Sequence, residues 1–184
     1  MSALAPADSL TPRVWAGCLH CYNSGRLVGE WFDCTEAAEV DLDAVHAGTC
    51  GPWPGCEELW CFDADNVPVT TEMGLADAGA WGEVFEEVGQ TLWPALCAWV
   101  ASGSYVAQGD TDLPCVEDFT ERYCGTWPSF EDYARDDADS TGLMQSWSQE
   151  AVRYFHWQAW TRDLAQDYTV ERAGLGEVYV FRDM

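Results

Sequence analysis

Cysteine and histidine side chains crowd the first third of this 184-residue chain, and the chemistry that they share is metal binding. Cys18-x-x-Cys21 has the spacing at which two thiolates can share one zinc ion. The other candidate ligands follow at irregular spacings and are Cys34, Cys50, Cys56, Cys61, His20 and His46. If a strand runs through His20, Cys18 and His20 share one face and Cys21 lies at a turn. Because the spacings are irregular, we interpret these cysteines as buried or half-buried thiols and predict no bound metal and no cofactor.

Two acidic residues, Asp63 and Asp65, follow the apolar run 59–62 in the order D-x-D-x-V. This pattern resembles the nucleophile motif of haloacid-dehalogenase-like phosphotransferases, in which one aspartate attacks phosphorus and magnesium neutralises the phosphate. Such a fold needs several later βαβ units and a downstream cation, usually lysine. The chain contains no lysine, and the next segment predicts helices without parallel strands. A magnesium-dependent phosphotransferase is therefore the weakest of the functional alternatives.

Other catalytic and binding patterns are incomplete or missing from the sequence. Residues 137–142 match the first half of a calcium loop, but its twelfth position is Ser148 instead of a bidentate glutamate, so we interpret them as an acidic turn. Glu86 and Glu87 are consecutive, and on a helix they point about 100° apart instead of forming a dyad. The chain has no G-x-S-x-G, P-loop or G-x-G-x-x-G. We therefore predict that the protein is not an enzyme.

Short strands and amphipathic helices must position these side chains, and their mixture indicates an α+β fold. Aromatic and β-branched runs predict strands over 13–20 and 28–33 around a turn, and a third strand over 59–62. Thr35 is expected to cap a helix over 36–46. A loop rich in glycine and proline separates that helix from the third strand.

The middle of the chain predicts two helices. The first has an apolar face opposite its glutamates, made by Trp81, Val84, Phe85 and Val88. The second begins at Pro94 and ends before Gly103.

The last third predicts helices followed by a hairpin. Ser129 and Asp132 form a capping box ahead of a short acidic helix. A longer helix is expected to carry on one face Tyr154, Trp157, Trp160 or Thr161, and Leu164. Strands over 168–171 and 178–181 then pair around a glycine-containing turn.

These elements predict a flexible N-terminus and three small domains. The N-terminus covers 1–12 and the first domain, an antiparallel sheet with a helix, covers 13–70. The second domain, 71–115, is acidic and helical. The third, 116–184, combines helices with a small antiparallel sheet.

The charge of the chain limits what it can bind. Asp and Glu number 32 against eight basic residues, all arginine, which gives a net charge of −24. A chain with 48% hydrophobic residues and eleven tryptophans can still bury enough apolar surface to fold. Such a surface repels nucleic acid and anionic membranes, so we expect a basic partner and no direct binding of DNA. Adaptation to high salt, or codon usage that removes lysine, is the alternative explanation.

The N-terminal residues and the cysteines bear on location. MSALAPADSLTPR has neither a basic start nor an apolar run, so we expect no secretory signal. No stretch has the length and apolarity of a membrane helix, and the odd number of cysteines suggests mostly reduced thiols. We expect a cytoplasmic protein.

Four blocks of sequence together resemble ArdA-type antirestriction proteins. Residues 14–33 resemble the family's opening strand, its Y-N-x-G turn and G-x-W, and residues 61–68 resemble its acidic strand end before a proline. Residues 119–134 are similar to F-x-x-x-Y-x-G-x-[WY]-x-S-x-x-[DE]-[FY]-A, and 154–164 to Y-F-D-x-x-A-x-x-R-D-L. The chain departs from the family in having His156 where an acid is common and in its many cysteines.

The resemblance implies an elongated homodimer of three small domains per chain that mimics double-stranded DNA. Such proteins occupy the DNA-binding groove of Type I restriction–modification enzymes, and mobile genetic elements carry them to evade restriction. The resemblance implies that restriction is blocked. It does not specify whether modification is blocked as well. An acidic inhibitor or interaction protein for another basic DNA-binding target is the main alternative.

We expect the mimic surface to consist of exposed acids on strand ends, loops and helix faces, acting collectively. By contrast, Arg153 and Arg162 are expected to pair internally in buried positions. The candidate acids are Glu57, Glu58, Asp63, Asp65, Glu83, Glu86, Glu87, Glu117, Asp118, Glu121, Glu131, Asp132, Asp136, Asp137 and Asp139.

Overall fold

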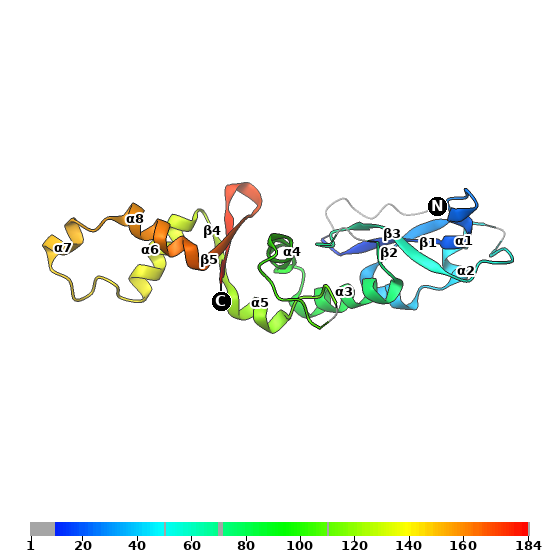
Figure 1. The fold of residues 1–184 in the computed structure, drawn as a ribbon, viewed down its shortest axis with the longest axis horizontal. Coiled ribbons are helices and arrows are strands. Elements are labelled where there is room, and N and C mark those ends of the chain that lie inside the picture. Colours follow the sequence, from blue (N-terminus) through cyan, green and yellow to red (C-terminus); the bar gives the residue numbers. More distant parts are fainter. Residues whose placement is uncertain (1–9, 50, 70–71, 110, 184) are drawn as a thin grey trace. The chain divides into compact units, whose positions relative to one another are not determined.

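The computed structural model describes residues 10–49, 51–69, 72–109 and 111–183 and confirms the α+β class. It contains two three-stranded antiparallel sheets with helices (Figure 1). The chain divides into two compact units. Unit 1 is Met1–Cys97 with Ala107–Val116, and unit 2 is Ala98–Val106 with Glu117–Met184. Most of the predicted flexible N-terminus, 1–12, lies outside the described residues, and the division into three domains stays a prediction.

The sheet of unit 1 has the order β2-β1-β3. Its central strand β1 (Arg13–Cys18) pairs with β2 (Gly29–Asp33) and with β3 (Leu59–Asp65), which is longer than predicted. Strand β1 ends at Cys18 instead of continuing to His20, because helix α1 (Leu19–Asn23) follows at once. His20 is therefore helical, and the expectation that it shares a strand face with Cys18 is wrong.

The helix predicted over 36–46 is split into two short pieces. The 3-10 helix η1 (Cys34–Glu39) comes first, the extended residue Val40 interrupts it, and α2 (Leu42–Val45) follows. The residue that caps α2 is Asp41, whose carboxylate accepts a hydrogen bond from the Ala44 N–H at 2.8 Å. Thr35 lies inside η1 and makes no cap, so both the length of the helix and its cap were predicted wrongly.

Two longer helices follow β3 as the sequence predicts. Helix α3 (Leu75–Val88) packs along η1 and buries Trp81 and Val84. Helix α4 (Trp93–Ser102) ends before Gly103, which has a φ of 78°. The Trp93 indole N–H donates to the carbonyl of Asn66 at 2.9 Å and so fixes the start of α4 on the turn after β3.

Unit 2 contains the second sheet, of order β4-β6-β5. The predicted hairpin is confirmed as β5 (Tyr168–Arg172) and β6 (Val178–Arg182), which pair antiparallel across the turn η3 (Gly174–Gly176). The third strand was not predicted. It is β4 (Tyr123–Trp127), which directly follows α5 (Val116–Arg122) and pairs with β6.

Aromatic rings fill the core of unit 2. Phe119 and Phe181 are fully buried, and the ring of Trp99 lies 5.8 Å and 6.3 Å from theirs, measured between centroids. Buried aromatic pairs at such separations add stabilisation beyond their burial. Trp99 thus serves the core of a unit whose surface is strongly charged.

The acidic helix α6 (Phe130–Ser140) starts at Ser129 as predicted, but among the described residues the reciprocal bond of a capping box, from the Ser129 N–H to the Asp132 carboxylate, is not formed. Ser129 Oγ accepts from the Asp132 N–H at 3.2 Å and donates to the Asp132 carboxylate at 2.6 Å.

The prediction of one longer helix from Tyr154 to Leu164 is wrong. Helix α7 (Gln149–Arg153) ends first, and α8 (Trp157–Leu164) starts anew and leads into η2 (Ala165–Asp167). His156 caps α8, since its Nδ1 accepts from the Ala159 N–H at 3.1 Å.

Among the described residues, no helix combines the length and the apolar composition that crossing a membrane requires.

Candidate functional site

The acids predicted to form the functional surface lie on both units and are almost all exposed. Asp118 and Asp137 are half-buried, and the other candidates are exposed. Glu57 and Glu58 end the loop before β3, and Asp63 and Asp65 stand on one face of that strand, because alternate residues of a strand point the same way. These four exposed acids of unit 1 therefore lie on consecutive segments, two on the loop and two on the strand that follows it.

Helix α3 shows how the sequence separates core from charge. Trp81 and Val84 are buried, whereas Glu83, Glu86 and Glu87 are exposed. At 100° per residue these three glutamates span an arc of about 100° on the helix surface. The helix has no basic residue at all. It presents a compact anionic stripe that its own chain does not neutralise.

Helix α6 carries a second anionic face, part of which is neutralised. Glu131, Asp132, Asp136 and Asp139 are exposed. Glu131 pairs with Arg135 at 2.7 Å, and the Asp132 carboxylate accepts a hydrogen bond from the Ser129 hydroxyl. On α5, Asp118 pairs with Arg122 at 3.5 Å. Glu131 and Asp118 are therefore the weakest members of the predicted surface.

Several arginines of the described residues are engaged by an aromatic ring or by a nearby acid. Three of them lie over tryptophan rings, with the guanidinium carbon 4.7 to 5.7 Å from the ring centroid: Arg13 over Trp31, Arg26 over Trp53 and Arg135 over Trp157. Within the described parts of the chain, no arginine lies within 4.0 Å of the carboxylates of Asp63, Asp65, Glu83, Glu86 or Glu87. These carboxylates are available to a cation outside the chain.

Arg153 and Arg162 differ from the sequence prediction. Both are exposed, and Arg162 pairs only with its neighbour Asp163, at 2.8 Å, with 73% of its side chain accessible. The prediction of buried internal pairs failed because the aromatic helix that was to bury them is broken at 154–156.

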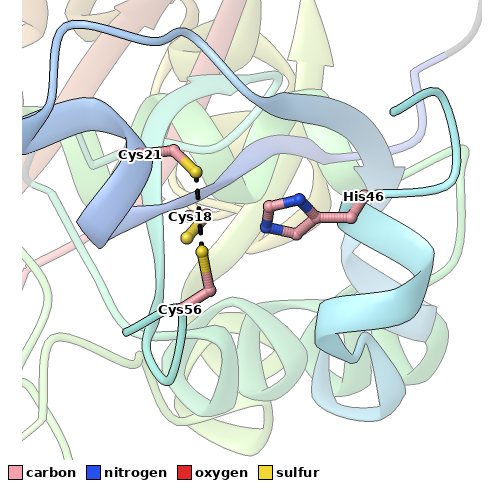
Figure 2. Close-up of side chains that lie close together, drawn as sticks. All are labelled: Cys18, Cys21, His46 and Cys56. Atoms are coloured by element: carbon pink, nitrogen blue, oxygen red, sulfur yellow. Dashed lines mark hydrogen bonds between the residues drawn. The ribbon is translucent and has the colours of Figure 1, made fainter. Parts of the chain in front are cut away.

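A second group of reactive side chains meets in the interior of unit 1. The Cys/His cluster consists of Cys18 at the end of β1, Cys21 on α1, His46 at the end of α2 and Cys56 in the loop before β3. Their side chains point toward one another (Figure 2), and the four candidate ligand atoms all lie within 4.8 Å of one another. All four residues are buried.

The thiols of the Cys/His cluster influence one another. Burial opposes ionisation of Cys18, but the backbone N–H of Cys21 and the polar side chains close to the sulfur stabilise the thiolate and lower its pKa to about 7. Burial and the two neighbouring sulfur atoms raise the pKa of Cys21 to about 11. All three sulfurs can be thiolates together only beside a positive ion.

The spacing of Cys18 and Cys21 indicates a pair, but their assembly with His46 and Cys56 was not predicted. Of the remaining candidates, Cys34 and Cys61 are buried elsewhere in unit 1, and Cys50 lies outside the described residues. The partners of the first pair come from positions 28 and 38 residues after Cys18, and only the fold brings them close.

The family model described as antirestriction protein (ArdA) matches residues 14–178, from β1 to the first residue of β6. The chain belongs to the ArdA family of antirestriction proteins. The resemblance predicted from four blocks of sequence is thereby confirmed, and it carries with it an antirestriction function directed at restriction–modification enzymes. Among curated proteins, no sequence matches this chain.

The ArdA family acts without catalysis. The topology of the sheet is also inconsistent with the phosphotransferase alternative. That alternative requires Asp63 and Asp65 to follow a strand of a parallel sheet. Strand β3 instead pairs antiparallel with β1. In unit 2, Asp137 and Asp139 lie within helix α6, so residues 137–142 do not fold as a calcium-binding loop.

Proposed function

We propose that this member of the ArdA family mimics double-stranded DNA and occupies the DNA-binding groove of a Type I restriction–modification enzyme. The observation that supports this most strongly is the set of exposed carboxylates without an arginine partner, above all Glu83, Glu86 and Glu87 on α3. A groove that binds DNA is lined with basic side chains, and the same side chains would bind such a surface.

The amount of charge is suited to this role. Duplex DNA carries one negative charge per roughly 1.7 Å of its axis. Two copies of this chain carry twice the −24 of one, −48. At the density of DNA this charge corresponds to about 80 Å of duplex. We propose a homodimer as the active form, because a single chain would match only half that length.

The proposed contact surface is the set of acids predicted from the sequence. An acid that already pairs with an arginine is expected to contribute less to it. Glu57, Glu58, Asp63 and Asp65 would act together with the α3 stripe in unit 1. In unit 2 the proposed contacts are Glu117, Glu121, Asp132, Asp136, Asp137 and Asp139. Asp118 and Glu131 would contribute less, because each already has an arginine partner.

The experiment that tests the proposal measures competition with DNA. A purified Type I enzyme is bound to a fluorescent duplex that contains its recognition site, and the protein is added at two salt concentrations. We expect displacement at near-stoichiometric dose, and weaker displacement at the higher salt, because exposed charge pairs are screened. Cleavage and methylation are assayed in parallel, and sedimentation of the free protein gives its oligomeric state.

Two other outcomes would count against the proposal. A folded protein that leaves the enzyme bound to DNA at either salt concentration would contradict the proposal and direct attention to another basic DNA-binding target. Displacement that does not change with salt would retain the target but reject electrostatic mimicry as the mechanism.

A further inference from the structure

We propose that Cys18, Cys21, His46 and Cys56 bind one zinc ion that stabilises the fold of unit 1. Nothing in the antirestriction function requires such a site, and the proposal is independent of how the acidic surface acts.

The spacing of the sulfur atoms fits a shared metal ion. Two thiolates bound tetrahedrally to one zinc ion, with Zn–S bonds of about 2.3 Å, have their sulfur atoms about 3.8 Å apart. The Sγ atoms of Cys21 and Cys56 are 3.6 Å apart. A disulfide would bring them to about 2.05 Å. The four ligand atoms, all within 4.8 Å of one another, leave space at their centre for one ion (Figure 2).

His46 supplies the observation that distinguishes a metal site from a group of buried thiols. The residue is only 1% exposed, and its Nε2 has no hydrogen-bond partner among the described residues. A buried polar atom left without a partner is costly and calls for an explanation. Figure 2 shows a nitrogen of this ring facing the sulfur atoms, and a metal ion there would satisfy it.

The other ring nitrogen of His46 is oriented as in many metal sites. Nδ1 lies 3.4 Å from the hydroxyl of Thr49, and that hydroxyl donates its own proton to the carbonyl of His46 at 2.9 Å. The hydroxyl can then only accept from Nδ1, which therefore carries the ring proton and leaves the lone pair on Nε2. A second hydrogen bond of this kind fixes both the tautomer and the direction of a histidine ligand.

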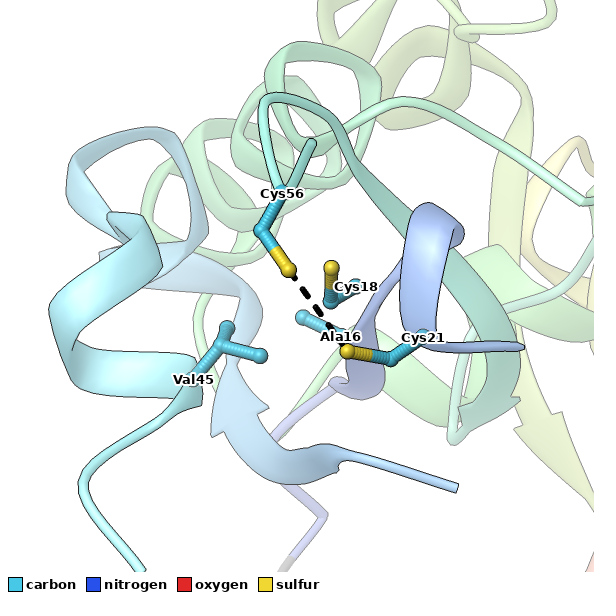
Figure 3. Close-up of a cluster of buried hydrophobic side chains, with 5 residues drawn as sticks. All are labelled: Ala16, Cys18, Cys21, Val45 and Cys56. Carbon is cyan, nitrogen blue, oxygen red and sulfur yellow. Dashed lines mark hydrogen bonds between the residues drawn. The ribbon is translucent and has the colours of Figure 1, made fainter. Parts of the chain in front are cut away.

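The ligand set and its burial indicate zinc in a structural role. Three cysteines and one histidine form a common zinc set, and a closed site with four protein ligands is typical of structural zinc. The cysteines form a buried core with Ala16 and Val45 (Figure 3).

The zinc ion would tie two short helices and an irregular loop to the central strand β1. The ligands come from the end of β1, from α1, from the end of the four-residue helix α2 and from the irregular loop before β3. Short helices and loops of this kind have little stability of their own, so a bond to a common ion would fix their mutual arrangement. The next residues after Cys56 are Glu57 and Glu58, which the ion would hold in place.

The test is the metal content of the full chain, purified without chelators and analysed by plasma mass spectrometry. We expect one zinc ion per chain, and cobalt exchanged into the site should give the visible absorption of a tetrahedral thiolate complex. Cys56→Ser should lose most of the zinc. The matched control is Cys61→Ser, which alters a cysteine that is also buried but lies outside the cluster, and it should retain the metal.

A second variant separates loss of a ligand from loss of the fold. Cys56→His replaces one zinc ligand by another and should keep the metal even if Cys56→Ser does not fold. The proposal is overturned if the folded, reduced wild-type chain contains no zinc and takes up neither zinc nor cobalt in titration. It is also overturned if Cys61→Ser loses as much zinc as Cys56→Ser.

Discussion

Gly82 of helix α3 lies directly against the backbone of Cys34: a Cβ atom at position 82 would stand 2.5 Å from the carbonyl carbon and oxygen of that residue. One turn earlier, a Cβ at Gly79 would meet the side chain of Ala38 at 2.9 Å. Two glycines three residues apart thus let α3 touch η1, with the glutamate stripe on the exposed side of the helix. The position of the stripe therefore depends on the absence of two side chains.

Gly82→Ala tests this contact. The new methyl group has no free space against the Cys34 backbone, so we expect the free energy of unfolding to fall by about 1–3 kcal/mol, the usual cost of overpacking. Urea denaturation measures it. Gly48→Ala is the control, because a Cβ there meets nothing within 4 Å and its backbone is not in the left-handed region. Equal stability of the two variants would show that α3 can move away from η1 at no cost.

The cap of α2 provides a second stability prediction. In Asp41→Ala the Ala44 N–H loses its acceptor, and we expect a loss of about 1 kcal/mol in the free energy of unfolding. Asp41→Asn keeps a side-chain oxygen at the same place and should retain most of the stability. Thermal unfolding of the three proteins compares them. If Asp41→Asn loses as much unfolding free energy as Asp41→Ala, the charge of Asp41 and not its capping hydrogen bond stabilises α2.

The stripe on α3 should matter more for inhibition than an equal number of acids elsewhere. Replacing Glu83, Glu86 and Glu87 together by Gln removes three adjacent charges, and we expect it to raise the dose needed to displace DNA from a Type I enzyme well beyond the effect of any single change. Exposed single charges contribute little one by one.

The matched control for the stripe removes three acids outside the predicted surface, by the changes Glu150→Gln, Glu171→Gln and Glu177→Gln. Because both triple variants have the same net charge, equal loss of inhibition would mean that total charge, and not a particular helix face, determines binding. No loss in either would count against charge matching altogether.

Arg135 allows stability and inhibition to be separated. Its guanidinium pairs with Glu131 on its own helix and lies over the ring of Trp157 on α8. Arg135→Gln should lower the free energy of unfolding by about 0.5–1 kcal/mol through the lost cation–π contact. It also frees the Glu131 carboxylate, so inhibition should not weaken. Arg162→Gln is the control, since that exposed residue pairs with its chain neighbour Asp163. Weaker inhibition by the folded Arg135→Gln protein would contradict the mimic model.

Residues that interact with near neighbours in the chain were the predictable part of this fold. The N-cap at Ser129, the apolar face of α3 and the hairpin of β5 and β6 each depend on spacings of two to four residues or on one turn, and all three are confirmed. The failures lie where a residue with a non-helical backbone interrupts a continuous pattern. Val40 divides the predicted helix over 36–46, and the new cap at His156 divides the one over 154–164.

Long-range relationships could not be predicted from the same patterns. Strand β4 was missed because its sequence, YCGTW, has no regular alternation and acquires its role only by pairing with β6, more than fifty residues later. The Cys/His cluster was missed for the same reason, as no spacing rule connects Cys21 with Cys56. For the acidic surface, all the predicted acids except Asp118 and Asp137 are exposed, but composition could not show that Asp118 and Glu131 have arginine partners.

Trp53 can serve as an intrinsic fluorescent reporter of the Cys/His cluster. Its ring lies edge-on to that of His46, with centroids 5.5 Å apart, while the guanidinium of Arg26 covers it at 4.7 Å. Indole emission responds to charge and to a quenching ion at such distances, so the light emitted by this one side chain should change whenever the state of the neighbouring imidazole changes. The difference between the spectra of the wild type and of Trp53→Phe would isolate that emission from the other ten tryptophans and allow events in the interior of unit 1 to be followed in real time.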